Sequence, residues 1–444
     1  MQRQAATPKG LQKRIQDLDL SQVEDPRMAK NVDIALPTLL AALITAMTTQ
    51  ARSLRAVERR TEQIAAKLGS FLGIVTRIAD NTFGRVLSRL KVADMTACLH
   101  RLIKAEHRRG NLVPHNLPEG AAALDGKNAG TLHWHDLCRV LELDPQKATS
   151  EEVKAALVEK YPEAQLCVPE HGKPYALIRM HTVTLISAKA APCIHIRPIL
   201  GKTNEIGSVP DLLNELHDSY GHTGLFKVIT TDAGNTSLGT AQMTLNKGWD
   251  YFAQIKSEHG ALFLEAVREL GVRDDPSASA TYADQQNGKT ATYYAWQYDL
   301  GQTGWLDWTH ARQLIRIKRV TEHPVTGEIT IGNRYYVCNR PLEMLDARLA
   351  LDFSRAHWRC EDETHWTCDV ELGEDRRKLS WSRHPRGILI VAVVRMIALC
   401  ILAIARKLSR MAYGKETPSW AQVAEHFLLV LCGTTLLTVD FDCA

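Results

Sequence analysis

The sequence predicts a mixed α/β protein with an N-terminal helical domain. Helical patterning runs from residue 32 to 103, strands and helices alternate from 177 to 270, and strand patterns alone fill 284–340. At 444 residues with 45% hydrophobic content, the chain can bury a full core and is long enough for two to four domains.

Charge and cysteine content bound the cellular setting. A net charge of +4 and a sequence pI near 8.5 fit a nucleic-acid partner without requiring one. The ten cysteines form no CxxC pair, which argues against a disulfide framework or a standard zinc finger and favours buried free thiols in a reducing cytoplasm. The first thirty residues are polar and charged, so no secretory signal is expected.

The N-terminal part is expected to be helical. Residues 1–30 form a polar segment and residues 31–110 a helical domain, whose arginine-rich second helix suits DNA ends or simply a solvated face. Those arginines are Arg52, Arg55, Arg59 and Arg60. The helices are expected at Ile34–Met47, Ser53–Leu68 and Thr82–Leu90, with Asn81 as the N-cap of the third.

An aspartate follows the first apolar strand of the next part. Residues 104–120 contain Gly, Pro and His and are expected to be a linker. The strand Ala121–Leu124 is then expected to stop at Asp125, where Gly126 would let the backbone turn away. Because α/β folds bind ligands at the rim of the sheet, this carboxylate is a candidate ligand.

Residues 131–177 have the composition of an insertion. A capping box, Thr149 with Glu152, opens a helix there. One HxHxxC spacing could serve zinc, but no second ligand pair is near it in sequence, which favours an ordinary structural role. The spacing belongs to His133, His135 and Cys138.

Strands and helices then alternate, as in a mixed α/β domain. The strand Phe226–Thr231 delivers Asp232 at its end, and the strand Tyr251–Ile255 ends at Lys256. The other expected elements are the strands Ile178–Ala188 and Cys193–Leu200 and the helices Val209–Leu216, Ser237–Leu245 and Ala261–Leu270.

Residues 284–340 are expected to form a β-rich insertion. Its strands are ATYYAWQY, RQLIRIKRV, GEITI and RYYVCN, with a turn at Pro324–Gly327. One face of the second strand is largely basic and follows two tryptophans, which suits a nucleic-acid backbone with unstacked bases or, alternatively, an edge strand guarded by cations. The face holds Arg312, Leu314, Arg316 and Lys318, and the tryptophans are Trp305 and Trp308.

The stretch Leu351–Lys378 has no Gly or Pro before Gly373, so most of it is expected to be one helix. At 100° per residue, one stripe of that helix places Glu361 among apolar and histidine side chains, and a buried acid needs a partner or a metal. Asp125 and Asp232 could supply it, and the three acids could together hold divalent cations. The stripe comprises His357, Glu361, His365, Cys368 and Leu372.

A long apolar run, Ile388–Ala405, has Arg395 in its middle. An arginine at mid-bilayer costs at least about 2.5 kcal/mol, so a core helix is favoured over a membrane span. The C-terminal region 388–444, interrupted by Pro418, is expected to be helical.

Several segments, in order, resemble the DDE transposases of bacterial insertion sequences, in the branch that includes the H-repeat-associated proteins. The segments are ALDGK, KTNEIGSVPDLL, ITTDA, DYFAQIK and the pattern R-x-HW-x-x-E-x4-W-x-x-D-V-x-x-x-E-D, and DNTFGRVLSRL resembles that family's N-terminal associated domain. The resemblance runs from about Asp25 to at least Asp375.

The resemblance implies an RNase H-like catalytic core, with a first part at 121–283, the β-rich insertion at 284–340 and a catalytic helix within 341–387. Asp125, Asp232 and Glu361 would be the catalytic and metal-binding triad, holding two Mg²⁺ (or Mn²⁺) ions per active site. Such an enzyme cuts transposon ends in double-stranded DNA and joins the 3′-OH to target DNA. It would act as a homodimer in the synaptic complex. It would need no membrane and would be a cytoplasmic, nucleoid-associated protein of a bacterium.

This chain departs from the signature of the wider superfamily around the glutamate. That signature places Arg four residues before the glutamate and Lys seven after, where this chain has His357 and Cys368, with Arg355 six before. Neighbouring acids compete for the ligand role, and Glu361 is preferred on its stripe and motif position. The competitors are Asp362, Glu363 and Glu371.

The remaining expectations concern DNA contacts and rival functions. Lys127, Lys256, Arg355 and His357 are candidates to hold phosphates, and no ATP is required because no GxxxxGK[ST] loop occurs. One rival is a zinc-dependent hydrolase using the H-x3-E-x3-H set His357, Glu361 and His365. The other is a descendant that binds DNA and no longer cuts it.

Overall fold

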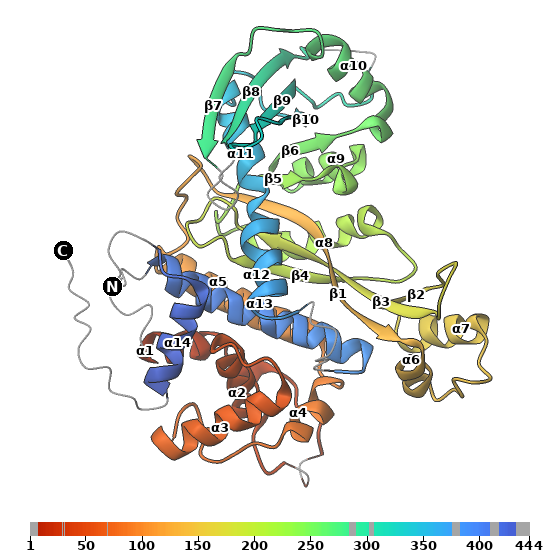
Figure 1. The fold of residues 1–444 in the computed structure, drawn as a ribbon, viewed down its shortest axis with the longest axis vertical. Helices are drawn as coiled ribbons and strands as arrows, with labels where there is room; N and C mark the ends of the chain where they lie inside the picture. Colours follow the sequence, from red (N-terminus) through yellow and green to blue (C-terminus); the bar gives the residue numbers. More distant parts are fainter. Residues whose placement is uncertain are drawn as a thin grey trace, which may run out of the picture.

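A single ten-stranded mixed sheet forms the centre of the molecule (Figure 1). The computed structural model describes residues 8–28, 30, 32–68, 70–283, 290–301, 306–374, 382–408 and 417–431. The strand order is β2-β3-β1-β5-β6-β10-β9-β8-β7, and β4 pairs with β3 beside this path. The predicted mixed α/β class is therefore confirmed.

Helices occupy the N-terminal part. They are α1 (Pro8–Asp17), a 3₁₀ turn (Leu20–Gln22), α2 (Leu36–Thr48), α3 (Leu54–Leu68), α4 (Asp80–Leu87) and α5 (Val92–Arg108). The predicted N-cap at Asn81 is wrong. α4 begins at Asp80, two residues before the predicted first residue Thr82, so Ala79 is the N-cap residue. Its first free amide, that of Asp80, donates 3.2 Å to a carboxylate oxygen of Glu58 on α3, so the helix needs no cap of its own.

The strand that carries Asp125 does not stop there. β1 (Ala121–His133) pairs in parallel with β5 (Val228–Thr231) from Ala121 only as far as Leu124. Its antiparallel pairing with β3 (Tyr175–Thr184) continues to His133. The backbone therefore stays extended past Asp125, contrary to the predicted end. What ends at Leu124 is the parallel ladder, so Asp125 and Asp232 both follow its last pair, Leu124 with Thr231.

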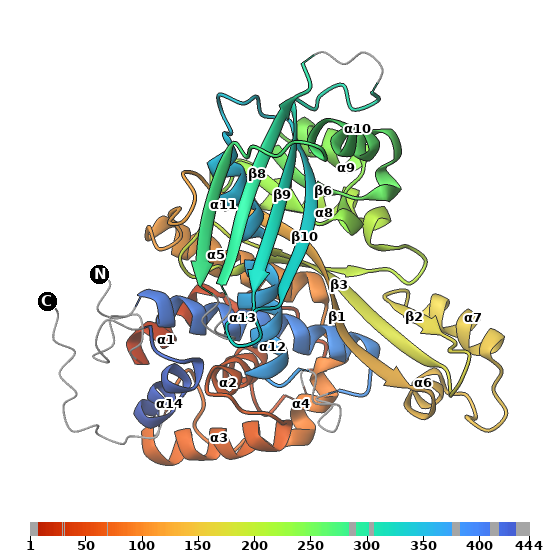
Figure 2. The same cartoon turned by 45° about the horizontal axis from the view of Figure 1, so that its top comes forward.

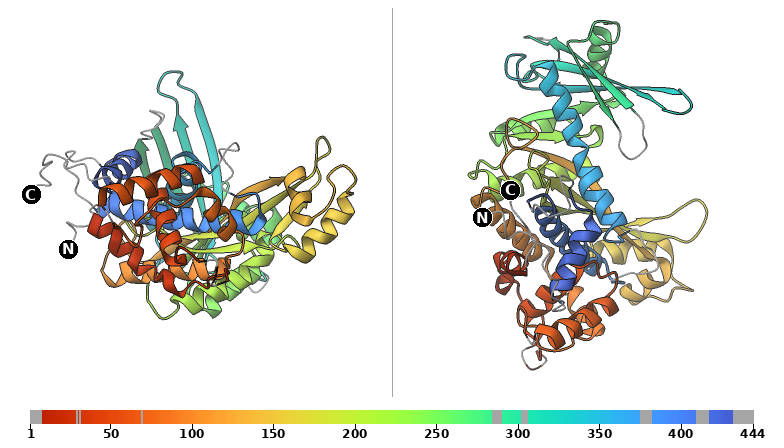
Figure 3. Two further views of the ribbon diagram at one scale, coloured as in Figure 1. Left: turned by 90° about the horizontal axis from the view of Figure 1, so that it is seen from below. Right: turned by 60° about the vertical axis from the view of Figure 1, so that its left-hand side comes forward.

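The extended ends of β1 and β3 form an arm that projects from the sheet (Figure 3). Its tip carries α6 (Trp134–Leu141), α7 (Ser150–Lys160) and β2 (Ala164–Cys167). The predicted capping box at Thr149 and Glu152 is present. Of the possible zinc ligands, His133 and His135 are exposed and Cys138 is buried, which agrees with their ordinary structural role.

The remaining core strands are β4 (Cys193–Ile199) and β6 (Asp250–Ile255), which runs parallel to β5. Helices α8 (Glu205–Tyr220), α9 (Leu238–Asn246) and α10 (Gly260–Leu270) lie near their predicted positions, α8 starting four residues earlier than expected. Asn204 caps α8 by accepting from the Gly207 amide, which explains the earlier start.

The β-rich insertion continues the core sheet rather than forming a separate one (Figure 2). Its strands are β7 (Ala278–Ala283), β8 (Thr290–Asp299), β9 (Gln313–Glu322) and β10 (Ile329–Cys338). β10 pairs antiparallel with β6, from Tyr335 opposite Ile255 to Cys338 opposite Phe252. The two predicted strands GEITI and RYYVCN belong to one strand, β10. The sequence analysis missed β7, because its sequence, ASATYA, is poor in large apolar residues.

The helix expected over Leu351–Lys378 is interrupted. α11 (Ala347–His357) covers one face of the insertion, a π-helical segment comes next at Cys360–His365, and α12 (Trp366–Val370) ends the run, with residues 375–378 outside the described part (Figure 3). A π turn holds more residues than an α turn and so rotates the residues after it about the helix axis. The predicted stripe is therefore broken: His357 and Cys368 are buried, while Glu361 is exposed.

The apolar run forms α13 (Pro385–Leu408), which lies between the sheet and the N-terminal helices (Figure 1). It is long and apolar enough to cross a membrane, yet 94% of its most apolar window is buried within the molecule. It packs on α2, α5, β1, β4 and α14 (Trp420–Leu431), as expected of a core helix. Arg395 is tolerated there because it lies 2.6 Å from the Glu374 carboxylate.

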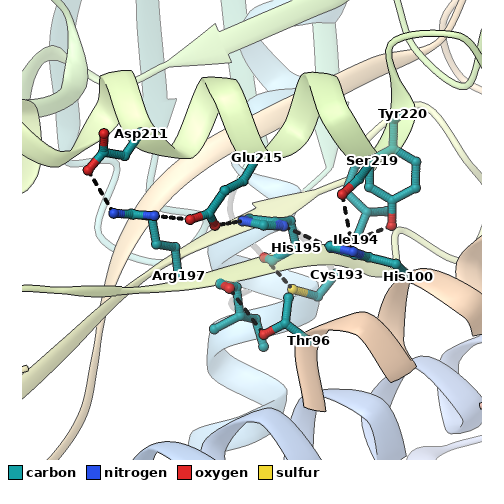
Figure 4. A network of polar contacts seen from close by, with 11 residues as sticks. Thr96, His100, Cys193, Ile194, His195, Arg197, Asp211, Glu215, Ser219 and Tyr220 are labelled. Atoms are coloured by element: carbon teal, nitrogen blue, oxygen red, sulfur yellow. Dashed lines mark hydrogen bonds and ion pairs between the residues drawn. The ribbon is translucent and has the colours of Figure 1, made fainter. Parts of the chain in front are cut away.

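Two histidines join the N-terminal helices to the core (Figure 4). Nε2 of His100 on α5 lies 2.8 Å from Nδ1 of His195 on β4, and Nε2 of His195 lies 3.2 Å from the Glu215 carboxylate on α8. Arg197 pairs with the same carboxylate. Burial, and secondarily the proximity of His195, lower the pKa of His100 to about 3, so this imidazole is neutral in the folded chain.

Acid is expected to destabilise the fold through such histidines. His100 has a folded pKa near 3 against an ordinary value of 6.5, so the unfolded chain binds the extra proton and stability falls as the pH drops from about 6.5 toward 3. His100→Gln should reduce the slope of unfolding free energy against pH by about 1.4 kcal/mol per pH unit between pH 6 and 4, measured by urea denaturation. The exposed His135, changed to Gln, should leave that slope unaltered, and an equal slope in both variants would contradict this assignment.

Candidate active site

Asp125 lies at the centre of an acidic cluster. Its Oδ1 accepts the Gly126 amide at 2.7 Å, and its Oδ2 lies 3.4 Å from Nδ1 of His365 and 3.7 Å from Sγ of Cys360. Burial raises the pKa of Asp125 to about 7, and the charges of Asp232 and Glu361 contribute to that rise. Both predicted partners therefore lie close enough to act on this carboxylate.

Asp232 is fixed by the turn after β5. It is the N-cap of a 3₁₀ turn at Ala233–Asn235. Oδ1 accepts the backbone amide of Asn235 at 3.1 Å and its side-chain amide at 2.7 Å, whereas Oδ2 has a single longer bond, 3.3 Å to the Gly234 amide. One oxygen thus anchors the side chain and the other keeps lone-pair capacity for a ligand.

Glu361 comes from the π-helical segment and faces the same cluster. Burial raises its pKa, and the neighbouring Asp362 and the more distant Asp232 raise it further, while Arg334 on β10 opposes them. Its side chain is nevertheless exposed, because the segment lies at an open pocket. π turns of this kind are frequent at functional sites.

The pocket has a volume of about 400 Å³. Its walls contain two of the three predicted acids, Asp125 and Glu361, together with an exposed tryptophan, and Asp232 is not among the lining residues. The lining residues are Asp125, Gly126, Glu361, Asp362, His365, Trp366 and Asp369. The site is thus an open, acid-lined depression rather than an enclosed cavity.

The donor set fits a hard divalent cation. Carboxylate oxygens are what Mg²⁺ and Mn²⁺ prefer, and mutual repulsion among these acids is a cost that a bound cation would remove. In the described part of the chain, no group of three or more His, Cys, Asp or Glu side chains already stands in metal-ligating geometry.

A fourth acid, Glu205 on α8, was missed from the sequence as a site residue. A Cβ built on Gly126 would lie only 2.6 Å from Cδ of Glu205, and Glu205 is among the charges that raise the pKa of Asp125. The role expected for Gly126 is therefore corrected: the strand does not turn there, and glycine instead leaves room for this carboxylate. The signal was present, since Glu205 lies in the segment KTNEIGSVPDLL.

The two histidines expected beside Glu361 serve different neighbours. His357 is buried, and its Nδ1 lies 2.8 Å from the Thr230 hydroxyl. Burial lowers the pKa of His357 to about 4. Nε2 of His365 lies 2.7 Å from the Thr182 hydroxyl, and burial, with Lys127, lowers its pKa to about 3. His357 is therefore buried away from any phosphate, and the two histidines of the set His357, Glu361 and His365 bond hydroxyls on different strands.

Three of the other predicted DNA contacts are engaged inside the protein. Lys127 is 7% exposed and lies 2.6 Å from Asp369 and 3.1 Å from Glu374, which raise its pKa. Arg316 is buried and donates to the carbonyls of Leu270 and Gly271 at the end of α10. Arg355 stacks 3.2 Å above the Tyr282 ring.

The basic stripe predicted on β9 is not a free surface. Helix α10 packs on that face, which places Leu314 and Arg316 in the core and leaves Arg312 exposed at its end and Lys318 half-buried. Trp308 is buried, and Trp305 lies outside the described residues. The pattern failed because period-two spacing gives a shared face but does not say what covers it.

Lys256 remains well placed for DNA. It follows the last residue of β6, and it is exposed. Because β5 and β6 are parallel, their carboxyl ends meet at one edge, so Lys256 lies at the same edge as Asp232.

Comparisons with known proteins find similar sequences. Residues 19–103 match the family described as DDE_Tnp_1-associated. Two Escherichia coli K12 proteins, YbfL and the H repeat-associated candidate transposase YhhI, are each 26% identical to this chain over 211 residues, which is 45% of this chain and 52% of theirs.

The chain is similar to transposases of the H-repeat-associated branch. The predicted resemblance to the H-repeat-associated branch is thereby confirmed. This transposase relative spans about half the length of the curated proteins it matches. A cryo-EM structure of a piggyBac transposase synaptic complex with hairpin DNA is also similar, with 12% identity, 96% coverage of this chain, 80% of that chain and a TM-score of 0.45.

Proposed function

We propose that this transposase relative is a DDE-type DNA transposase with an RNase H-like core, which cuts transposon ends and joins the 3′-OH to target DNA. One observation carries the proposal: Asp125 and Asp232 follow adjacent parallel strands, Glu361 follows α11, and all three act on one another electrostatically. The order β4-β3-β1-β5-β6, antiparallel as far as β1 and parallel after it, supports the RNase H-like assignment.

The proposed site would hold two divalent cations on Asp125, Asp232 and Glu361. Bound there, such ions would activate the attacking oxygen and stabilise the leaving one in an in-line displacement at phosphorus. His365, held by the Thr182 hydroxyl, directs a ring nitrogen at Asp125 and so orients that carboxylate. Asn235 does the same for Asp232.

Double-stranded DNA is the proposed substrate, as transposon end and as target. The pocket is open, and Lys256 stands exposed at the sheet edge that holds Asp232. We further propose that a homodimer holds two ends together in the synaptic complex and that the protein works in the bacterial cytoplasm. Two copies would supply one active site for each end.

A cleavage assay tests the proposed function. The full chain is incubated with labelled duplex DNA from the regions flanking its gene, with Mg²⁺, Mn²⁺, Zn²⁺ or EDTA. The proposal predicts strand cleavage that leaves 3′-OH ends and requires Mg²⁺ or Mn²⁺. Binding without cleavage under every condition would instead indicate the non-catalytic descendant, and cleavage restored by Zn²⁺ alone would overturn the two-metal assignment.

Divalent cations are expected to stabilise the folded chain. A ligand present at 100 times its dissociation constant adds about 2.7 kcal/mol to the unfolding free energy. Thermal unfolding should therefore shift upward with Mn²⁺ in the wild type and much less in Asp125→Asn. A matched control, Asp211→Asn, alters an acid that pairs with Arg197 outside the site and should keep the shift. Equal shifts in all three proteins would contradict the site.

A further inference from the structure

Arg334 lies at the edge of the sheet where the acids gather. It precedes Tyr335 on β10, and Tyr335 pairs with Ile255, the last residue of β6. Arg334 is therefore one residue beyond the β6 ladder, on the side where β5 has already ended at Thr231. The insertion thus brings a cation to the edge that holds Asp232.

Its guanidinium is held toward the segment that carries Glu361. Arg334 shares the face of β10 that packs on α11, since Tyr336, two residues on, hydrogen-bonds to Ser354 at 2.8 Å. The guanidinium carbon lies 4.0 Å from the centre of the Trp358 ring, and Trp358 is three residues before Glu361. A stacked arginine keeps its donors in one plane, directed outward from the edge of the ring.

Arg334 differs from three arginines near the core that are each paired with a carboxylate. Arg340 pairs with Glu119 and Asp250, Arg359 with Glu363, and Arg395 with Glu374. Within the described part of the chain, no carboxylate lies in ion-pair distance of Arg334. A half-buried guanidinium beside an acidic pocket, without a paired acid, is set up for an anion.

The other candidate cations lie elsewhere or are engaged. Lys127 pairs with Asp369 and Glu374, Arg355 stacks on Tyr282 of β7 at the far edge of the sheet, and His357 is buried. DNA approaching Asp125 and Glu361 meets several like charges, so a cation must lie beside them for a phosphate to bind. Arg334 reaches that position from β10 instead of from the helix.

We propose that Arg334 is a phosphate ligand of the candidate active site, contacting the backbone of the DNA strand that is cut. The inference rests on the proposed function. Trp358 acts as the platform that fixes the guanidinium, so the bidentate geometry of arginine matters and lysine is an incomplete substitute.

The test compares Arg334→Gln and Arg334→Lys with Arg319→Gln. Arg319 is a matched control, because it is also an arginine on an insertion strand near an aromatic ring, 5.9 Å from the centre of Tyr293, but it is exposed on β9. Affinity for labelled duplex DNA from the gene's flanks is measured in EDTA over a range of salt, alongside cleavage with Mn²⁺ and thermal unfolding.

Losing one phosphate contact should lower the slope of log affinity against log salt by about 0.9 in Arg334→Gln. Arg334→Lys should keep most of that slope yet cleave at least about tenfold more slowly than the wild type, because one bidentate contact is lost. Arg319→Gln should match the wild type in slope and cleavage. Unfolding temperatures within the wild-type range show that the fold is kept.

A wild-type slope in Arg334→Gln, or an equal fall in Arg319→Gln, would overturn the inference. So would a loss of slope that accompanies a loss of thermal stability and recurs in Trp358→Phe, since that pattern means a structural role. Because DNA binding is read in EDTA, failure here is distinct from failure of the proposed function, which would appear as a wild type that binds DNA and never cuts it.

Discussion

Asp232→Asn is expected to lower strand cleavage by about 1000-fold while the protein stays folded. Loss of a carboxylate ligand removes several kcal/mol of metal-mediated transition-state stabilisation, and each 1.4 kcal/mol is a factor of about ten in rate. The asparagine oxygen can still accept the backbone and side-chain amides of Asn235, and only the longer 3.3 Å bond from the Gly234 amide is lost, so the turn after β5 is kept. Single-turnover cleavage of labelled DNA, with circular dichroism as the check on folding, measures the effect.

The matched control for this substitution is Asp211→Asn. Asp211 is an exposed acid on α8 that pairs with Arg197 at 2.7 Å, away from the pocket. It should cleave at the wild-type rate. A wild-type rate for Asp232→Asn as well would mean that this carboxylate holds no catalytic ion.

Lys127→Met is expected to cost about 3–5 kcal/mol of unfolding free energy. Lys127 pairs with both Asp369 and Glu374, which are largely buried. Methionine has about the length of the lysine side chain, but it removes the positive charge that pairs with the two carboxylates. The network joins β1, α12 and α13, because Glu374 also pairs with Arg395. Urea denaturation followed by tryptophan fluorescence measures the loss.

Lys154→Met provides the comparison, because Lys154 is exposed on α7. That change should stay within about 0.5 kcal/mol, as is usual at the surface. If Lys127→Met also falls below about 1 kcal/mol, the network is worth no more than a surface ion pair. Lys127 would then again be a candidate DNA contact.

The positions of the two aspartates could be predicted because each follows an apolar run in the sequence. Apolar runs that end at Asp125 and Asp232 mark buried strands, and parallel neighbours bring their carboxyl ends together. The helical elements of the first hundred residues were also recognisable, since their apolar spacing is regular. These features depend on residues close in the chain.

The features that failed depend on what lies across from a residue. A charge count could not show that Lys127 faces Asp369, or that α10 covers Arg316. Likewise, no periodicity reveals a π turn, because the extra residue at Cys360–His365 is invisible to a 100° rotation. Arg334 was not recognised because it lies on β10, far from Glu361 in the sequence. Only the fold shows that it stacks on Trp358, three residues before Glu361.

The glycine after Asp125 shows the same limit. From the sequence it predicted a turn, yet β1 continues and the missing Cβ instead admits Glu205. A glycine signals either unusual backbone angles or close approach of another group, and the sequence does not distinguish them.

The central claim is that Asp125, Asp232 and Glu361 share divalent cations, and a crystal structure of the DNA complex with Mn²⁺ tests it most directly. Anomalous scattering should reveal two ions roughly 3.5–4 Å apart, ligated by oxygens of these three side chains. Manganese bound elsewhere, with these three carboxylates outside a common coordination sphere while DNA occupies the pocket, would contradict it.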